Sequence, residues 1–124
     1  MTMKDRFLDC LEIYRARDCG DHIELELPVL LHFNQQLLTL HIVPLGEEQG
    51  YYVLDGGTAF CDDDYDASYY FERFEREDKN YHYEIGVSEE CFFKQYPAEF
   101  GVRVAVSEFV RFFVYLDDFI LKLE

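Results

Sequence analysis

Residues 22–54 read HIELELPVLLHFNQQLLTLHIVPLGEEQGYYVL. Apolar and polar side chains alternate through HIELEL at the start, which is typical of a strand with one buried face, and Pro28 is expected to close or edge this strand. The alternation returns over residues 37–43, and residues 46–50 have the composition of a turn that leads into a third strand at residues 51–54. The stretch therefore predicts a meander of three antiparallel strands.

Helical spacing of apolar side chains occurs on both sides of this meander. We expect one helix over residues 3–18 and another over residues 65–78, whose outer face carries charged pairs four residues apart. Residues 81–85 are expected to form a strand. Residues 88–93 are expected to form a short helix with a serine cap, bounded by Pro97.

The strongest helical pattern covers residues 106–123. One face of this helix is apolar and the opposite face is polar, and Phe112, Phe119 and Leu123 widen the apolar face beyond the usual width. We weigh a monomer, in which the whole apolar face packs on the sheet, against a homodimer through this helix. The order α-βββ-α-β-α predicts one α+β domain over residues 1–124, in which a small antiparallel sheet of about four strands packs with N-terminal, middle and C-terminal helices.

The charge balance is strongly acidic, with 26 acids against 11 lysines and arginines and a formal net charge of −15. Such a chain is not expected to bind nucleic acid or an anionic membrane directly, because both require a cationic surface. No run approaches the length of a membrane-spanning helix, the first residues lack the pattern of a signal peptide, and the cysteines show no C-x-x-C spacing. We therefore expect a cytoplasmic protein with reduced cysteines.

The patterns for metal binding and catalysis are incomplete. Asp62, Asp64 and Asp66 match the first three ligand positions of an EF-hand loop, but the glycine position holds Ala67 and the last ligand position holds Arg73. The histidines lack the spacing of a transition-metal site, and the serines and cysteines lie outside nucleophile motifs. The sequence therefore predicts no enzyme activity, no cofactor and no metal.

Three segments carry a family resemblance: His22–Pro28, Leu38–Val43 and Gly50–Thr58. Together they resemble domain of unknown function 1828, an uncharacterised bacterial and phage family. Its pattern has a strand that ends in proline, a second strand, and a tyrosine-containing strand that runs into a turn of acids and glycine. Here one acid precedes two glycines, Asp55-Gly56-Gly57, where the family tends to have two acids before one glycine. The resemblance implies a prokaryotic or phage source and a small α+β domain, and no known chemistry.

Acidic residues are concentrated in the middle of the chain. Between Asp55 and Glu90 there are twelve acids against three lysines and arginines, which gives −9 of the net −15. Tyrosines lie between these acids, and tyrosine is a side chain that suits an interface. We predict a partner-binding face that consists of Asp62, Asp63, Asp64, Asp66, Tyr69, Glu72, Glu75, Asp78, Glu89 and Glu90.

A folded face of carboxylates can compete with nucleic acid for a basic groove, and its charge steers fast association. The sequence therefore favours a phage-type inhibitor, such as an anti-CRISPR or anti-restriction protein, that mimics DNA and blocks a basic nucleic-acid-binding enzyme or complex. Two alternatives stay open. In one, the chain is a toxin-neutralising or other small binding module that uses its hairpin surface, with incidental acidity. In the other, the acids form a solvated helix on a protein whose function lies elsewhere.

Overall fold

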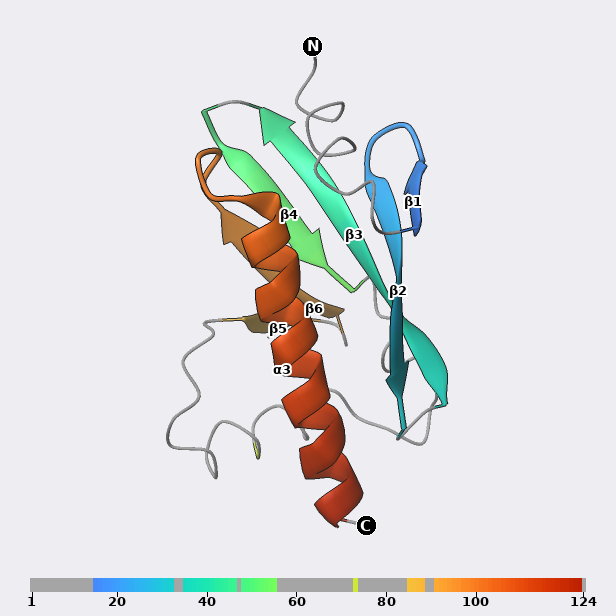
Figure 1. Ribbon diagram of the computed structural model, residues 1–124. Coiled ribbons are helices and arrows are strands. Elements are labelled where there is room, and N and C mark those ends of the chain that lie inside the picture. Colours follow the sequence, from blue (N-terminus) through green and yellow to red (C-terminus); the bar gives the residue numbers. More distant parts are fainter. Residues whose placement is uncertain are drawn as a thin grey trace.

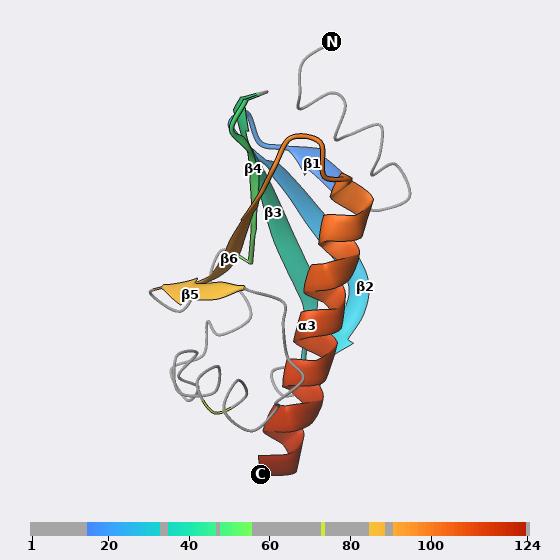
Figure 2. The same cartoon turned by 90° about the vertical axis from the view of Figure 1, so that its left-hand side faces the viewer.

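The computed structural model describes residues 15–32, 35–46, 48–55, 73, 85–88 and 91–123. Within these residues, six strands form one antiparallel sheet in the order β1-β2-β3-β4-β6-β5, and the long helix α3 lies along one face of it (Figures 1 and 2). The elements are β1 (Arg15–Asp18), β2 (Ile23–Leu31), β3 (Gln36–Gly46), β4 (Gly50–Leu54), β5 (Gly86–Ser88), β6 (Cys91–Tyr96) and α3 (Val102–Leu123). The fold class is α+β, as the sequence predicts, with more strands than the four expected.

The predicted meander is confirmed by β2, β3 and β4. Leu25 lies opposite Leu40 in one ladder and Ile42 opposite Val53 in the next, so that the buried residues of the three strands share one face. The expectation that Pro28 ends the first strand is wrong, because β2 continues to Leu31. Proline is tolerated there because it is exposed and the register of the β2–β3 ladder shifts between Glu26 and Leu30.

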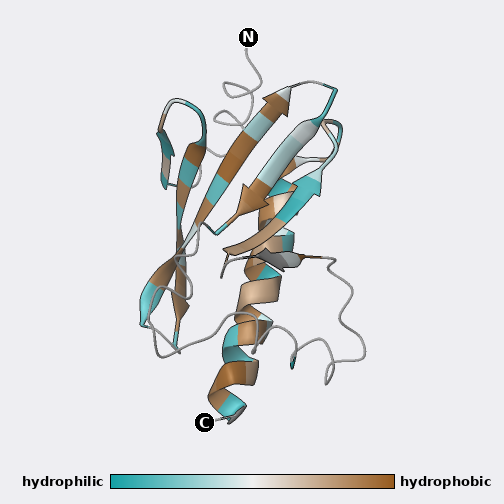
Figure 3. Ribbon diagram, turned by 180° about the vertical axis from the view of Figure 1, so that it is seen from behind, coloured by the Kyte–Doolittle hydropathy of each residue, from teal (hydrophilic) through white to brown (hydrophobic). Residues whose placement is uncertain are grey.

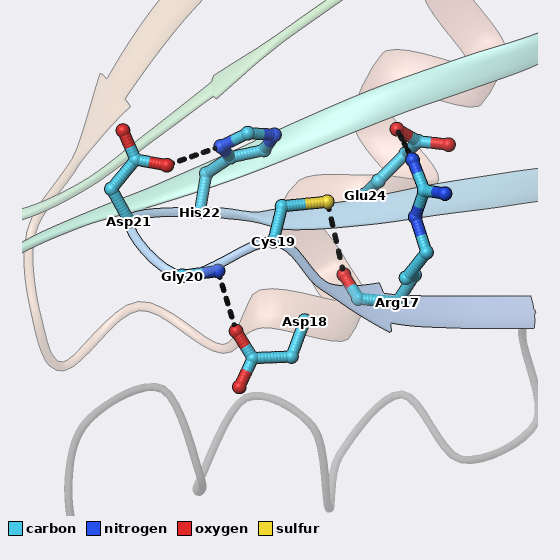
Figure 4. A network of polar contacts seen from close by, with 7 residues as sticks. All are labelled: Arg17, Asp18, Cys19, Gly20, Asp21, His22 and Glu24. Atoms are coloured by element: carbon cyan, nitrogen blue, oxygen red, sulfur yellow. Dashed lines mark hydrogen bonds and ion pairs between the residues drawn. The ribbon is translucent and has the colours of Figure 1, made fainter.

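The first helix does not reach Asp18, because Arg15–Asp18 form strand β1. Opposite charges on neighbouring strands favour this pairing: Arg17 donates to Glu24 at 2.9 Å and Arg15 to Glu26 at 3.4 Å. Figure 4 shows the connection to β2, where the Asp18 carboxylate accepts a hydrogen bond from the backbone N–H of Gly20. The part of the predicted helix that precedes Arg15 lies outside the described residues.

The short helix expected over residues 88–93 is also wrong. Ser88 ends strand β5, and Cys91–Tyr96 form strand β6, which pairs with β4 on one side and β5 on the other. Burial of Phe92 and Tyr96 follows the alternation of a strand. Pro97, expected to bound this helix, instead directly follows the end of strand β6.

Two other predictions fall largely on residues that the structure does not describe. Of the helix expected over residues 65–78, only Arg73 is described, and it is helical. Of the strand expected over residues 81–85, only Ile85 is described; it is buried and directly precedes β5.

Helix α3 covers the sheet with the apolar face that the sequence predicts. Phe112 and Phe113 pack edge-on against Phe92 of β6, with ring centroids 5.3 and 5.4 Å away. Phe112 is buried and Phe119 is partly buried, so the extra width of the apolar face is largely used within the chain. Seen from behind, the strands carry alternating hydrophilic and hydrophobic residues (Figure 3). None of the helices in the described part of the chain is both long and apolar enough to span a membrane.

Candidate partner-binding surface

All ten residues predicted to bind a partner lie outside the described residues: Asp62, Asp63, Asp64, Asp66, Tyr69, Glu72, Glu75, Asp78, Glu89 and Glu90. What the structure does define is the part of the sheet to which these segments are attached. The described residues on either side of them are Asp55, Ile85, Ser88 and Cys91.

Asp55 fixes the point at which the chain leaves the sheet after β4. Its side chain is fully buried, and its Oδ1 accepts a hydrogen bond from the backbone N–H of Phe92 at 2.7 Å. Its own backbone N–H donates to the carbonyl of Phe92 at 3.1 Å. A strand carboxylate invites comparison with a nuclease acid, but these contacts make Asp55 a structural group that joins the end of β4 to β6.

The chain re-enters the sheet beside β6, one residue along from the position that Asp55 contacts. Gly86, the first residue of β5, lies opposite Phe93 of β6, and Ile85 before it is buried. Because neighbouring strands are about 4.8 Å apart, Asp55 and Gly86 lie on the two sides of β6 at a separation of roughly 10 Å. Residues 56–84 thus begin and end at one place on the sheet.

The acidic pair at residues 89–90 joins β5 to β6 at the same end. Ser88 and Cys91, which flank it, lie opposite each other in the β5–β6 ladder. Cys91 directly precedes Phe92, the residue that Asp55 binds. Three points at which acidic segments leave or enter the sheet therefore lie within a few residues of each other around the first half of β6.

The charge of the protein is unevenly divided between the scaffold and these segments. The strands and α3 contain six acids and six lysines and arginines, whereas residues 56–84 and 89–90 contain eleven acids and three lysines and arginines, which gives −8 of the total −15. Several scaffold acids form ion pairs: Glu24 with Arg17 at 2.9 Å, and Glu108 with Lys94 at 2.7 Å. The scaffold is nearly neutral.

Two buried tyrosines do not contribute to an external face. Tyr51 and Tyr96 stack with ring centroids 5.6 Å apart. The Tyr51 hydroxyl donates to the carbonyl of Phe100 at 2.8 Å, and the Tyr96 hydroxyl to Glu108 at 3.2 Å. Burial, and secondarily the carboxylate of Glu108, raises the pKa of both phenols. Both side chains therefore stay neutral and hold the start of α3 against the sheet.

Histidine side chains make close side-chain contacts at two places in the scaffold. His32 binds Asp117 of α3 through its Nδ1 at 3.1 Å and through its backbone N–H at 3.0 Å. His22 lies against His41 with ring centroids 5.2 Å apart. Burial, and secondarily the neighbouring His22, lowers the pKa of His41. Within the described ranges, no group of three or more histidines, cysteines, aspartates or glutamates could hold a metal ion.

Asp117 is a buried acid whose long-range contact could not be predicted from the sequence. It is only 6% exposed and contacts a residue 85 positions away in sequence. An acid directly beside the apolar face of a long helix, next to Leu116, is the signal that could have indicated a buried, partnered carboxylate.

Comparisons with protein-family models, with curated proteins and with solved structures gave no match to this chain. The resemblance to domain of unknown function 1828 therefore stays a prediction.

Proposed function

We propose that this chain is a non-enzymatic, acidic interaction protein that inhibits a nucleic-acid-binding partner by occupying its basic groove. The observation that supports the proposal is the separation of charge: the strands and α3 have no net charge, whereas residues 56–84 and 89–90 carry −8 of the total −15. If the acids served only for solubility, we would expect them to be spread over the whole surface and mixed with lysines and arginines. Here the strands and α3 show such a mixture, whereas residues 56–84 and 89–90 contain eleven acids against three lysines and arginines.

The attachment of the acidic stretch supports the same proposal. Its two ends are held beside Phe92 and Phe93, on one rigid strand of the sheet. Rigid anchoring limits the conformational entropy that is lost when a charged segment binds a partner. A cationic cleft that normally receives a phosphate backbone is the complementary surface.

The proposed partner is a basic enzyme or complex that acts on nucleic acid, of the kind that anti-restriction and anti-CRISPR proteins of phages inhibit. A shared cytoplasmic location is part of the proposal. The chain itself does not bind nucleic acid, because its charge has the wrong sign.

The test compares two variants that lose the same number of negative charges. In the first, Asp62 and Asp63 are changed to asparagine; in the matched control, Glu48→Gln and Glu99→Gln remove two exposed scaffold charges. Each protein is immobilised and exposed to a prokaryotic host lysate, and nucleic-acid-binding proteins that it retains are quantified. Two charge contacts at about 0.5 kcal/mol each predict roughly a fivefold loss of affinity in the first variant only.

Salt provides the second readout. Retention by the unchanged protein should fall at least about tenfold between about 50 and 500 mM NaCl, because salt screens charge pairs at an exposed interface. Equal retention by both variants, together with salt-independent binding, would contradict the proposal. That result would favour the alternative in which the hairpin of β3 and β4 binds the partner.

A further inference from the structure

Two histidines meet on the face of the sheet that is opposite to α3. His41 of β3 lies opposite Glu24 of β2, and His22 precedes Glu24 by two residues. Because side chains two residues apart point to the same face of a strand, both imidazoles lie on this outer face, whereas Ile23 and Ile42 beside them are buried in the core. The pairing of β2 with β3 thus brings together two imidazoles that are far apart in the sequence.

The separation of the two rings fits a shared metal ion. Zinc binds histidine nitrogen at about 2.0–2.1 Å in a tetrahedral arrangement, which places the centroids of two imidazoles on one ion about 5 Å apart. The centroids of His22 and His41 are 5.2 Å apart, and the planes of the two rings meet at 57°. The pair therefore needs little rearrangement to hold one ion between its rings.

The hydrogen bonds of the two rings leave nitrogens for an ion. The Nδ1 of His22 binds the carboxylate of Asp21 at 2.7 Å, and Figure 4 shows that the other nitrogen of this ring points away from Asp21. A carboxylate on the far nitrogen is the usual outer partner of a metal-binding histidine, because it fixes the tautomer and the orientation of the ring. His41 is half-buried, and neither of its ring nitrogens is hydrogen-bonded to a residue in the described part of the chain.

The space at the two rings can admit an ion with its water ligands. A hollow of about 270 Å³ is lined by the two imidazoles together with Val43 and Leu54. Valine and leucine supply no ligand, so water completes the coordination of an ion that the imidazoles bind. The charged side chains beside the imidazoles are Asp21, Glu24 and Arg17, of which Arg17 binds Glu24 at 2.9 Å. Their sum is negative, which favours a cation.

We propose that His22 and His41 together bind one Zn²⁺ ion on the outer face of the sheet. Each imidazole supplies one nitrogen, the Asp21 carboxylate holds the ring of His22 in orientation, and water occupies the remaining positions. The sequence does not indicate this site, because the two histidines meet only through strand pairing. The proposed function concerns the acid-rich stretch and is independent of the zinc site.

The ligands determine both the kind of ion and its affinity. Imidazole nitrogen suits zinc, whereas Mg²⁺ and Ca²⁺ prefer carboxylate and carbonyl oxygen. Two protein ligands are half the set of a structural zinc site, in agreement with the finding that no group of three or more metal-binding side chains occurs within the described ranges. We therefore expect a moderate affinity, with a dissociation constant on the order of 30 µM.

The test is a calorimetric titration of the whole chain with ZnCl₂ at about pH 7.5, where an ordinary imidazole is neutral. His22→Gln and His41→Gln should each raise the dissociation constant at least about tenfold, because a single imidazole no longer chelates the ion. The matched control is His32→Gln, which removes an exposed histidine from the pair with Asp117 and should leave the constant unchanged. Circular dichroism verifies that each variant is folded. Equal zinc binding by His22→Gln and the unchanged protein overturns the proposal.

Two further measurements distinguish this site from the carboxylates of the chain. Mg²⁺ at about 1 mM should not compete with zinc, because imidazole does not favour Mg²⁺; competition would place the ion on acids and overturn the proposal. In NMR spectra of the unchanged protein, the ring signals of His22 and His41 should shift together as zinc is added. This measurement decides the matter even if a variant fails to fold, since zinc that shifts neither ring, or only one of them, overturns the shared site.

Discussion

At the scale of single residues, Asp55 connects the folded scaffold to the acidic stretch. The sequence indicates that a strand ends there, because acid and glycine residues follow an apolar run. Its burial could not be predicted, since its partner Phe92 is 37 residues away and falls within a segment whose sequence favours a short helix. Local patterns describe strand ends well but do not contain long-range pairings.

We predict that Asp55→Ala lowers the free energy of unfolding by about 2 kcal/mol, because the buried N–H of Phe92 loses its hydrogen-bond acceptor. Asp55→Asn should cost less, since the amide oxygen can still accept this bond. Urea denaturation followed by circular dichroism measures both. Glu48→Ala, at an exposed position, is the control and should change the value by less than about 0.5 kcal/mol. Equal effects of Asp55→Ala and the control would refute the structural role of Asp55.

At the scale of elements, the sequence predicts the strands and the helix whose hydrophobic periodicity extends over many residues. The meander and α3 are correct because alternation and helical spacing each extend over many residues. Strands β1 and β6 are missed because their short sequences, RARD and CFFKQY, acquire strand structure by pairing with β2 and with β4 and β5. Of the candidate site, only the concentration of acids in one stretch could be predicted from the sequence. That both ends of this stretch lie beside β6 depends on the order of the strands in the sheet, which the sequence pattern does not contain.

The turn between β3 and β4 provides a paired test of the hairpin. A methyl group on Gly50, whose φ is +81°, would collide with the carbonyl oxygen of Tyr96 and lie 3.0 Å from the N of Ala98, both backbone atoms. Gly46 also has positive φ, +118°, but nothing lies within 4 Å of such a group. Gly46→Ala should therefore cost about 1–2 kcal/mol from backbone strain alone.

Gly50→Ala should cost at least about 3 kcal/mol, because strain and collision add together. Urea midpoints of the two variants, measured side by side, give the comparison. If Gly50→Ala is no more destabilised than Gly46→Ala, the close approach of β4 to the end of β6 is wrong.

At the scale of the whole molecule, charge is unevenly divided between the described sheet and helix and the acid-rich stretch of the sequence. The sheet and α3 form a nearly neutral scaffold with a buried aromatic core, and the strands hold both ends of the acid-rich stretch beside β6. The proposed partner binding concerns the acid-rich stretch, so it can be tested independently of the stability of the scaffold.

The central claim is that the acids take the place of nucleic acid in a partner's groove, and competition tests it most directly. A partner captured from lysate is purified, bound to a fluorescent duplex DNA, and titrated with this protein while anisotropy and complex mass are recorded. Mutually exclusive binding predicts that the protein displaces the duplex and that the concentration needed rises in proportion to the duplex present. A stable complex that contains partner, duplex and protein together would contradict the claim.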